Sequence, residues 1–380
     1  MIGGRQLSGG DLKGARVLLA GGAGFIGRAL LRRLLEAGAE VTVLTPKPPV
    51  WTVGAGPAEA ERVAWVGAEG APQTPAKEVA WVVAEAAPPA PGEGAPQVLV
   101  GRAADPRIAK RLGGERWDAV VNLAGRIDQR AGAERQAYRD HFEHVRALAH
   151  AVAERTTRFV QVGSAAEYGA APVPHHEGLR EEPLSPYAAA KLAATHYLQM
   201  CHRAAGLPAV ILRLSLVYGP GQAPAAGFIP FAVDRALRGL PIPMTAGRQT
   251  RDPVFIEDVV RALLTTLTRS GIEGEVINIG GGRPLTMREL AARIIAVVGA
   301  GSVQAGAVPE RPGDPARSEM TIEKAARLLN WHPQVDLEAG LRLTVAAAGR
   351  RLNGSARPDG SPWTDGSART DGSARPEGSI

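Results

Sequence analysis

The sequence predicts an α/β protein whose main part is a doubly wound parallel sheet, with a smaller α/β region toward the C-terminus. Three observations lead to this class. Short apolar segments alternate with amphipathic ones from residue 15 onward, and a glycine-rich turn joins the first strand to the first helix. In addition, 380 residues with 45% hydrophobic content can bury one large core or two smaller ones.

The first elements form a strand-helix-strand unit. Residues 15–20 (ARVLLA) are predicted to be a buried strand, residues 28–37 an amphipathic helix, and residues 40–45 (EVTVLT) a second strand. Gly38 ends the helix, because glycine adopts the left-handed conformation that closes a helix. Such a unit implies two parallel strands. Residues 1–14 precede it as a short polar leader.

The pattern then changes in an Ala- and Pro-rich insertion at about residues 46–97. Two similar apolar pieces inside it, at 63–66 and 79–82, are candidates for a surface hairpin. Regular α/β spacing resumes beyond the insertion, so the sheet should be nearly complete by Gly163. The segments concerned are strands at 98–100, 119–124 and 158–162 and a helix at 138–154.

The chain is therefore expected to divide into one domain over residues 15–215, a second region over 216–350 and a tail over 351–380. The tail contains Gly-Ser-Ala-Arg three times and has almost no apolar residues. Such a segment cannot offset the entropy cost of ordering, so it is predicted to be disordered.

Composition excludes several classes of function. The single cysteine, Cys201, leaves no internal disulfide and no multi-cysteine metal site, and it is expected to pack between helices. The net charge of +6 comes from Lys and Arg scattered among acids, so no nucleic-acid partner is expected. His175 and His176 are assigned to a polar surface loop, and no metal site is predicted. The absence of a long apolar run or a secretory block predicts a cytoplasmic protein without a membrane partner.

The glycine-rich turn has the spacing of a phosphate-binding loop. Gly21, Gly24 and Gly27 stand at i, i+3 and i+6, where backbone N–H groups and the helix dipole can face a pyrophosphate. Gly24 would let the backbone approach the phosphates, and Gly27 would let the helix pack on the sheet. The first domain is therefore predicted to be a Rossmann-like NAD(P)-binding domain, with Phe25 and Ile26 among the residues that contact the cofactor.

The end of the second strand bears on the choice between NAD and NADP. Dinucleotide folds that take NAD usually carry an acid there, which holds the ribose hydroxyls. This sequence has Thr45 instead, so no carboxylate repels a 2′-phosphate, and Lys47 or Arg102 could pair with it. The cofactor is predicted to be NAD or NADP with a small preference for NADP, unless Lys47 only solvates the start of the insertion.

Tyr187 and Lys191 stand four residues apart, on one face of a helix that begins near Pro186. Lowering the pKa of a tyrosine by about three units, toward neutral pH, requires roughly 4 kcal/mol, which a nearby ammonium and an oxidised nicotinamide could supply. Ser164, at the end of a predicted strand, offers a hydroxyl that can position the reacting oxygen. These three residues are the predicted catalytic set.

With these three motifs the chain resembles the extended short-chain dehydrogenases/reductases, also called the NAD-dependent epimerase/dehydratase family. Further segments extend the resemblance to about residues 16–345. They are Asn122-Leu123-Ala124 beside the cofactor, residues 213–221 at the nicotinamide, and the C-terminal segments 251–258, 278–280 and 311–314.

The resemblance implies a role for each matching residue. Tyr187 would be the acid/base, Lys191 would bind the cofactor ribose and tune Tyr187, and Ser164 would hold the substrate oxygen. Leu123 and Ala124 would line the cofactor, and region 216–350 would mainly bind a nucleotide-linked sugar.

Four further positions concern the substrate region or depart from the family pattern. Arg251 and Arg311 are candidates for the substrate diphosphate, although each has an acid beside it and could instead form a surface ion pair. Leu216 and His144 stand where relatives often carry asparagine. The loss at Leu216 bears on the substrate phosphate, and the change at His144 on a proton relay or on helix packing.

The resulting expectation is an oxidoreductase or epimerase that transfers hydride at a carbon of a nucleotide-linked sugar. The alternatives are a keto-sugar reductase that releases oxidised cofactor and a non-catalytic dinucleotide-binding relative. Dehydration is disfavoured, because Ala165 and Ala166 stand where dehydratases of the family carry acids, and an extended segment would point Glu167 away from the site. A homodimer is left open.

Overall fold

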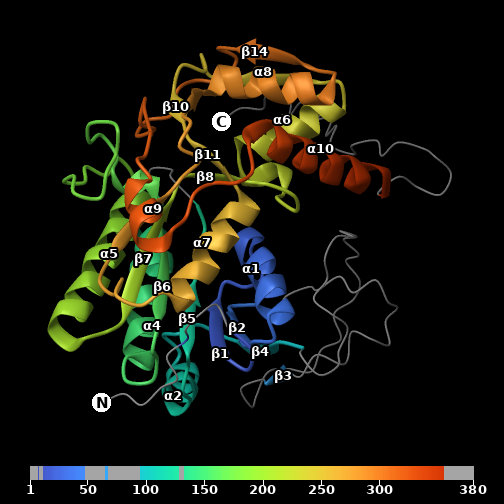
Figure 1. Ribbon diagram of the computed structural model, residues 1–380. Helices are drawn as coiled ribbons and strands as arrows, with labels where there is room; N and C mark the ends of the chain where they lie inside the picture. Colours follow the sequence, from blue (N-terminus) through green and yellow to red (C-terminus); the bar gives the residue numbers. More distant parts are fainter. Residues whose placement is uncertain (1–6, 8–11, 48–64, 67–94, 128–131, 355–380) are drawn as a thin grey trace, which may run out of the picture.

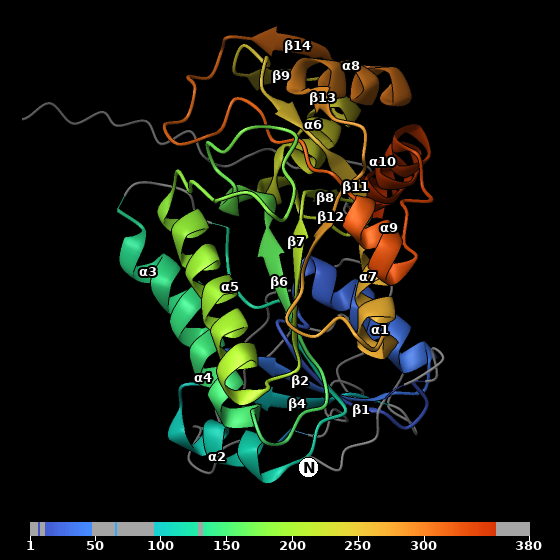
Figure 2. The same cartoon turned by 60° about the vertical axis from the view of Figure 1, so that its left-hand side comes forward.

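The computed structural model describes residue 7 and residues 12–47, 65–66, 95–127 and 132–354. The tail beyond residue 354 and most of the insertion lie outside these ranges, so the disorder predicted for the tail stays a prediction. A central sheet lies between two layers of helices, and a second lobe of helices and short strands stands at one end of the sheet (Figures 1 and 2).

The central sheet has eight strands in the order β12-β7-β6-β5-β1-β2-β4-β3, and every pair in it is parallel. The order runs outward in both directions from β1, as in a doubly wound fold. The predicted α/β class is therefore confirmed. The strands are β1 (Arg16–Ala20), β2 (Glu40–Thr45), β3 (Trp65–Val66), β4 (Gln97–Val100), β5 (Ala119–Asn122), β6 (Phe159–Ser164), β7 (Ala209–Leu214) and β12 (Val276–Ile279).

The short strand β3 falls in the predicted insertion. It pairs in parallel with β4 and extends the sheet by one strand. The hairpin suggested for this segment would need antiparallel pairing with the other apolar piece, at 79–82, which lies outside the described residues.

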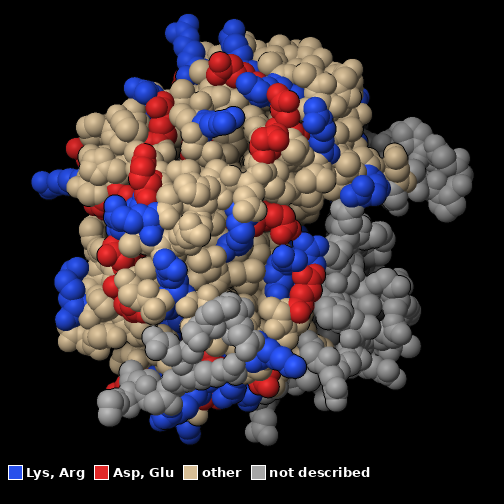
Figure 3. Space-filling model, in the orientation of Figure 1, with Lys and Arg blue, Asp and Glu red and all other residues tan. Residues whose placement is uncertain are grey.

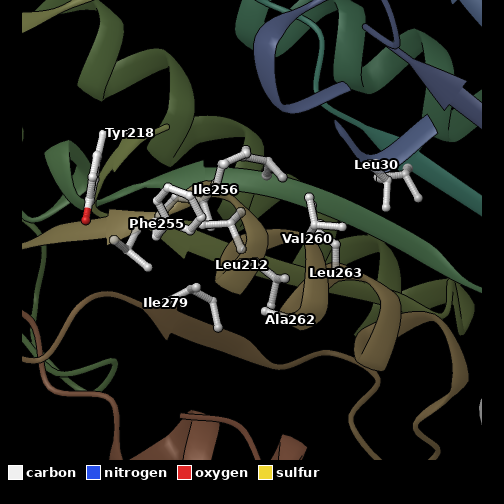
Figure 4. Close-up of a cluster of buried hydrophobic side chains, with 14 of the residues drawn as sticks. Leu30, Leu212, Tyr218, Phe255, Ile256, Val260, Ala262, Leu263 and Ile279 are labelled. Carbon is white, nitrogen blue, oxygen red and sulfur yellow. The ribbon is translucent and has the colours of Figure 1, made fainter. Parts of the chain in front are cut away.

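Helices cover both faces of the sheet and bury two separate apolar clusters. One face carries α1 (Phe25–Glu36) and α7 (Ile256–Thr268), whereas the other carries α2 (Pro106–Gly114), α4 (His144–Val152) and α5 (Pro186–Ala205) (Figure 1). Figure 4 shows part of the first cluster, where side chains of α7 such as Val260 and Leu263 lie between the sheet and Leu30 of α1. Strands that are covered on both faces consist mainly of apolar residues, as the sequence pattern indicated.

The second lobe is built from three helices and paired short strands. Helices α6 (Phe228–Leu237), α8 (Met287–Val298) and α10 (Leu337–Gly354) pack together, and β14 (Ser302–Ala305) pairs with β9 (Pro241–Met244). Between the lobe and the sheet, β8 (Leu216–Tyr218) pairs with β11 (Pro253–Phe255), and β10 (Thr250–Arg251) pairs with β13 (Leu285–Thr286). Helix α9 (Glu323–Leu329) lies beside α7.

Three features differ from the expected division of the chain. β12 belongs to the main sheet, although its residues fall in the region assigned to substrate binding, because it pairs with the exposed edge of β7. The leader is not purely solvated either, since Leu7 and Leu12 are buried in the cluster that contains Leu34. Helix α10 continues to Gly354, past the predicted start of the tail.

Charged side chains of both signs are interspersed on the face of the molecule seen in Figure 3. No helix in the described ranges is long and apolar enough to span a bilayer. Cys201 is partly buried and packs against the second apolar cluster.

Candidate active site

The glycine turn between β1 and α1 fits a dinucleotide phosphate. Gly21 has φ +81°, and a Cβ there would lie 2.7 Å from the Ala124 nitrogen. A Cβ on Gly27 would lie 2.2 Å from the Gly21 oxygen, so only glycine allows this approach. Gly24 is the N-cap of α1 and offers no side chain, which leaves the first N–H groups of the helix, including that of Phe25, without a side-chain cap. Helix α1 begins one turn earlier than predicted, and this places Phe25 and Ile26 in its uncapped first turn, where helix N–H groups can bind an anion.

The loop after β5 closes the other side of the turn. The Leu123 N–H donates to the Ala20 oxygen, and the Ala124 N–H donates to the side chain of Asn122. Leu123 and Ala124 therefore lie against the glycine turn, as their predicted contact with the cofactor requires.

The residues proposed for the ribose end of the cofactor have different surroundings. Thr45 is buried, and its hydroxyl donates to the Lys47 oxygen, whereas the Lys47 side chain is exposed. Arg102 lies 3.5 Å from a carboxylate oxygen of Asp140, which also faces Arg126. A 2′-phosphate would thus compete with Asp140 for Arg102, while Lys47 has no ion pair among the described residues.

The three predicted catalytic residues come together at the carboxyl end of β6. Ser164 is the last residue of this strand, and its hydroxyl lies close enough to the phenol of Tyr187 on α5 to lower the pKa of that phenol. Lys191 follows one helical turn later, and its Nζ donates to the Val162 oxygen at 2.7 Å. Pro186 occupies the first turn of α5 and the Ser185 side chain caps it, so the local sequence fixes where this helix starts.

Burial dominates the electrostatics of Tyr187 and Lys191. It raises the pKa of Tyr187 to about 12, against the hydrogen bond from Ser164, and it lowers the pKa of Lys191 to about 8. The expected lowering of the Tyr187 pKa is therefore not produced by the protein alone. Further positive charge has to reach the phenol before it can act as a base near neutral pH.

A histidine that the sequence analysis did not single out lies against Tyr187. The rings of His141 and Tyr187 meet edge to face, with centroids 4.9 Å apart, and His141 Nε2 is 2.8 Å from the Arg126 oxygen. Burial and the charge of Lys191 lower the pKa of His141 to about 4, so the imidazole is neutral at physiological pH. Its Nδ1 has no protein partner in the described structure.

His141 belongs to a π-helical turn, Arg139–Glu143, between α3 (Glu134–Tyr138) and α4. Such turns are rare and are often found at functional sites. His144 begins α4, and burial lowers its pKa to about 4 as well. The sequence analysis predicted one regular helix over this stretch, and regular periodicity gives no sign of the extra residue that turns His141 toward Tyr187.

Glu167 lies directly behind Ser164. Residues Ala165–Glu167 form a 3-10 helix rather than an extended segment, so the alternation argument made from the sequence does not apply. The Glu167 side chain is fully buried and accepts hydrogen bonds from the Ser164 N–H, the Thr195 hydroxyl and Arg213 Nε, each at 2.8 Å. Arg213 also forms an ion pair with Glu181 at 2.6 Å.

The assignment of His175 to a polar surface loop is wrong. His175 is fully buried and stacks on Tyr168, with ring centroids 4.8 Å apart. The Tyr168 hydroxyl donates to Asn278, and Arg213 lies over the Tyr168 ring. Apolar and aromatic neighbours from distant segments bury this polar position, whereas His176 is exposed. No cluster within the described ranges offers the three or more ligands that a metal ion needs.

The predicted substrate residues lie on the lobe side of the sheet. Leu216 is half-buried at the start of β8, and its N–H donates to the Asp252 oxygen. Arg251 donates to Asp314 and to the Pro315 oxygen, so the ion pair considered from the sequence is formed. Arg311 is exposed, and its loop meets the segment before α5, because a Cβ on Gly313 would lie 2.4 Å from the Leu184 oxygen.

A doubly wound parallel sheet with an uncapped glycine turn beside a partly buried Ser and buried Tyr and Lys side chains is the architecture of a dinucleotide-dependent enzyme. The model of the NAD dependent epimerase/dehydratase family matches residues 17–280. The chain belongs to this family, as the sequence motifs indicated.

Curated relatives and solved structures agree with this assignment. The chain is 28% identical to dTDP-glucose 4,6-dehydratase 1 of Escherichia coli K12 over 349 residues, which cover 87% of this chain and 91% of that one. It is 30% identical to UDP-glucose 4-epimerase of Mycolicibacterium smegmatis over 335 residues, covering 87% and 97%. The structure of UDP-glucose 4-epimerase from Thermotoga maritima with UDP-glucose superposes with a TM-score of 0.70 at 27% identity, covering 89% and 99%.

These relatives correct one expectation. Restricting the enzyme to an epimerase or a reductase, with dehydration disfavoured, is wrong, because several relatives are named dTDP-glucose 4,6-dehydratase. The argument rested on Ala165 and Ala166 and on the direction of an extended Glu167. Because the segment is a 3-10 helix, side-chain direction cannot be derived from strand alternation, and other elements can supply a proton-transfer group.

Proposed function

We propose that this protein oxidises a carbon of a nucleotide-linked sugar by hydride transfer to NAD(P), with Tyr187 as the acid/base. The observation that carries the proposal is the meeting of Ser164, Tyr187 and Lys191 at the end of β6. The glycine turn supports it, because Gly21 and Gly27 allow backbone approaches that a Cβ would block, and Gly24 leaves the first N–H groups of α1 without a side-chain cap.

Each side chain of the catalytic set has a defined role in this reaction. When bound, the oxidised nicotinamide supplies the hydride acceptor and a positive charge. The Ser164 hydroxyl orients the sugar oxygen, and Tyr187 removes the hydroxyl proton as the C–H bond breaks, which leaves a ketone. Lys191 stabilises the phenolate that must be present before this step and would hold the cofactor ribose.

The ketone makes more than one second step available. Returning hydride to the opposite face gives the epimer, whereas a ketone also makes the neighbouring C–H acidic enough for loss of water. We take dTDP-glucose and UDP-glucose as the substrates to test, since relatives are named for them. Arg251 and Arg311 remain the proposed contacts for the diphosphate, and Leu216 remains a proposed substrate contact.

Mass spectrometry of the products distinguishes these outcomes. Each nucleotide-sugar is incubated with the protein and NAD or NADP, oxidised or reduced. An epimer has unchanged mass and a new retention time, whereas dehydration lowers the mass by one water. A reductase oxidises one molecule of reduced cofactor for each keto-sugar that it reduces. Cofactor binding without any product from either sugar, or from a wider nucleotide-sugar panel, would instead identify a non-catalytic relative and refute the proposal.

Three finer expectations from the sequence stay predictions. They are the preference for NADP, the cytoplasmic location and a homodimer. Titration of both cofactors would test the first of these.

A further inference from the structure

Behind the catalytic set lies a charged cluster that the proposed reaction does not use. It consists of Glu167, Arg213, Glu181 and Thr195, and the side chains of Glu167 and Arg213 are 0% and 1% exposed. A buried ion pair of this kind rarely adds stability, because desolvation offsets the attraction between the charges. Its place beside Ser164 suggests a different role.

We propose that Glu167 is a positioning residue: its carboxylate fixes the backbone of Ser164 and places a negative charge behind Tyr187 and Lys191. The inference rests on the proposed function of these three residues. Glu167 itself touches no reacting atom and acts only through them.

The geometry divides the carboxylate into two halves. Oε1 accepts from the Ser164 N–H, and the Ser164 hydroxyl in turn accepts from the Ala166 N–H. Oε2 accepts from Thr195 on α5 and from Arg213 on β7. The carboxylate therefore ties the end of β6 to the helix that carries Tyr187 and Lys191, which sets the Ser164 hydroxyl relative to the phenol.

The charge of Glu167 reaches both partners. Two carboxylates, Glu167 and Glu181, face the single guanidinium of Arg213, so the cluster carries an excess negative charge. Glu167 raises the pKa of both Tyr187 and Lys191.

Several other groups face the same pair. Tyr187 meets the neutral His141 ring and the Ser164 hydroxyl, and Lys191 lies near enough to His141 and His144 to lower their pKa values. Within the part of the chain that the structure describes, Glu167 is the acid whose charge raises the pKa of both Tyr187 and Lys191.

Two variants separate this role from a merely structural one. Glu167→Gln and Glu181→Gln each remove one negative charge from Arg213, but only Glu167 contacts Ser164. A glutamine at 167 offers one oxygen. The charged Arg213 should take it, because charge-assisted hydrogen bonds are the stronger ones, so the NH₂ group is left facing the Ser164 N–H.

The first measurement is hydrogen exchange of the peptide that contains Ser164, which needs no substrate. We expect at least about tenfold faster exchange at Ser164 in Glu167→Gln and wild-type exchange in Glu181→Gln. Thr195→Val removes a neutral donor from Oε2 and keeps the charge, so it should give a smaller increase. This variant also serves if Glu167→Gln does not fold.

The second measurement is the pH profile of oxidation with the sugar that the wild type converts. Removing the charge of Glu167 favours the phenolate, so the rising limb should move to lower pH by about half a unit or more, with no shift in Glu181→Gln or Thr195→Val. Wild-type exchange at Ser164 in both Glu167→Gln and Thr195→Val would overturn the positioning role. Equal pH limbs in the two glutamine variants would overturn the electrostatic role. A wild type that converts no sugar refutes the proposed function instead, and exchange still decides the positioning role.

Discussion

At the scale of single residues, the site places the phenol of Tyr187 among neighbours that exclude water from it. Tyr187 is 5% exposed, and its pKa is raised to about 12 by burial, so the resting protein holds a neutral phenol. The positive charge that arrives with the oxidised cofactor is needed to bring the pKa down. The proposed mechanism thereby links the basicity of Tyr187 to occupation of the proposed cofactor site.

Tyr187→Phe tests the assignment of this residue. It deletes one oxygen and keeps the ring that packs against His141, so we expect an unchanged fold and unchanged NADH affinity. Turnover should fall by about a hundredfold to ten-thousandfold, the usual contribution of a general acid/base. Rates are compared with NADH binding measured on the same preparation; a variant with near-normal turnover would remove Tyr187 from the mechanism.

The buried imidazole of His141 predicts a loss of stability in acid. Its pKa is about 4 in the folded protein against an ordinary value of 6.5, so the unfolded chain binds the proton more readily. The contribution of neutral His141 to the free energy of unfolding is therefore fully present above pH 6.5. It declines by about 2–3 kcal/mol as the pH falls toward 4.

Urea unfolding at pH 7 and pH 4.5 measures this decline. His141→Phe should make the difference between the two pH values smaller, because the titrating group is gone. His150→Phe, at an exposed position of α4, is the matched control and should leave the difference unchanged. An equal difference in all three proteins would contradict the attribution to His141.

At the scale of elements, the sequence predicted correctly those features that depend on neighbouring residues within one segment. β2 has the predicted bounds, because a short segment rich in Val, Leu and Thr between Gly38 and Pro46 defines a strand by local sequence alone. The glycine turn and the Tyr187–Lys191 pair are equally local. Each depends on spacing within one segment.

Features that depend on distant packing could not be predicted. His175 lies beneath Tyr168 through contacts with residues more than a hundred positions away, such as Asn278. Glu167 meets Arg213 through the pairing of β6 with β7. The π-helical turn that brings His141 to Tyr187 has no periodic signature, and β12 joins the sheet only because β7 leaves an edge free.

Two helical glycines give opposite predictions on substitution by alanine. A Cβ on Gly27 of α1 would lie 2.2 Å from a backbone oxygen, so Gly27→Ala should push α1 off the sheet, destabilise the protein by about 1–3 kcal/mol and abolish NADH binding. Gly349 of α10 has open space at this position, and Gly349→Ala should stabilise by about 0.5–1 kcal/mol. Thermal unfolding and NADH titration of both variants provide the check, and intact NADH binding in Gly27→Ala would contradict the phosphate site.

The end of β2 carries the prediction on cofactor choice. We expect NADP(H) to bind at least as tightly as NAD(H), because Thr45 brings no carboxylate and Lys47 is exposed nearby. One partly exposed ammonium-phosphate contact supplies at most about 1 kcal/mol, so the preference should stay below about tenfold.

Titration of both cofactors against the wild type, Lys47→Ala and Arg102→Ala measures the preference. Loss of NADP affinity in Lys47→Ala alone supports its role. Loss in Arg102→Ala alone would show that the phosphate displaces Asp140 from Arg102. Tighter binding of NAD to the wild type refutes the preference.

At the scale of the whole molecule, the sequence of the C-terminal tail has almost no apolar residues to add to the two apolar clusters of the described residues. Deleting residues 355–380 should therefore change the melting temperature by no more than a degree or two, as expected for the loss of surface residues alone (about 0.5 kcal/mol or less). Deleting from Leu337 onward also removes α10, whose Leu341 is fully buried in the first cluster. This larger deletion should lower the melting temperature strongly. Calorimetry measures the melting temperature of both truncated proteins. A large drop in melting temperature after deletion of residues 355–380 alone would show that the tail packs on the described core.

The place of β12 in the sheet also governs how the chain is made. During synthesis, β7 emerges about sixty residues before β12, so at usual translation speeds its outer edge stays open for several seconds. An unpaired strand edge offers free N–H and C=O groups to any other nascent chain. The main sheet therefore cannot be completed before the second lobe is synthesised. Its last strand, β12, follows much of the second lobe in the sequence. We conclude that protection of the β7 edge, by a chaperone or by the growing segment itself, is part of the biogenesis that this topology imposes.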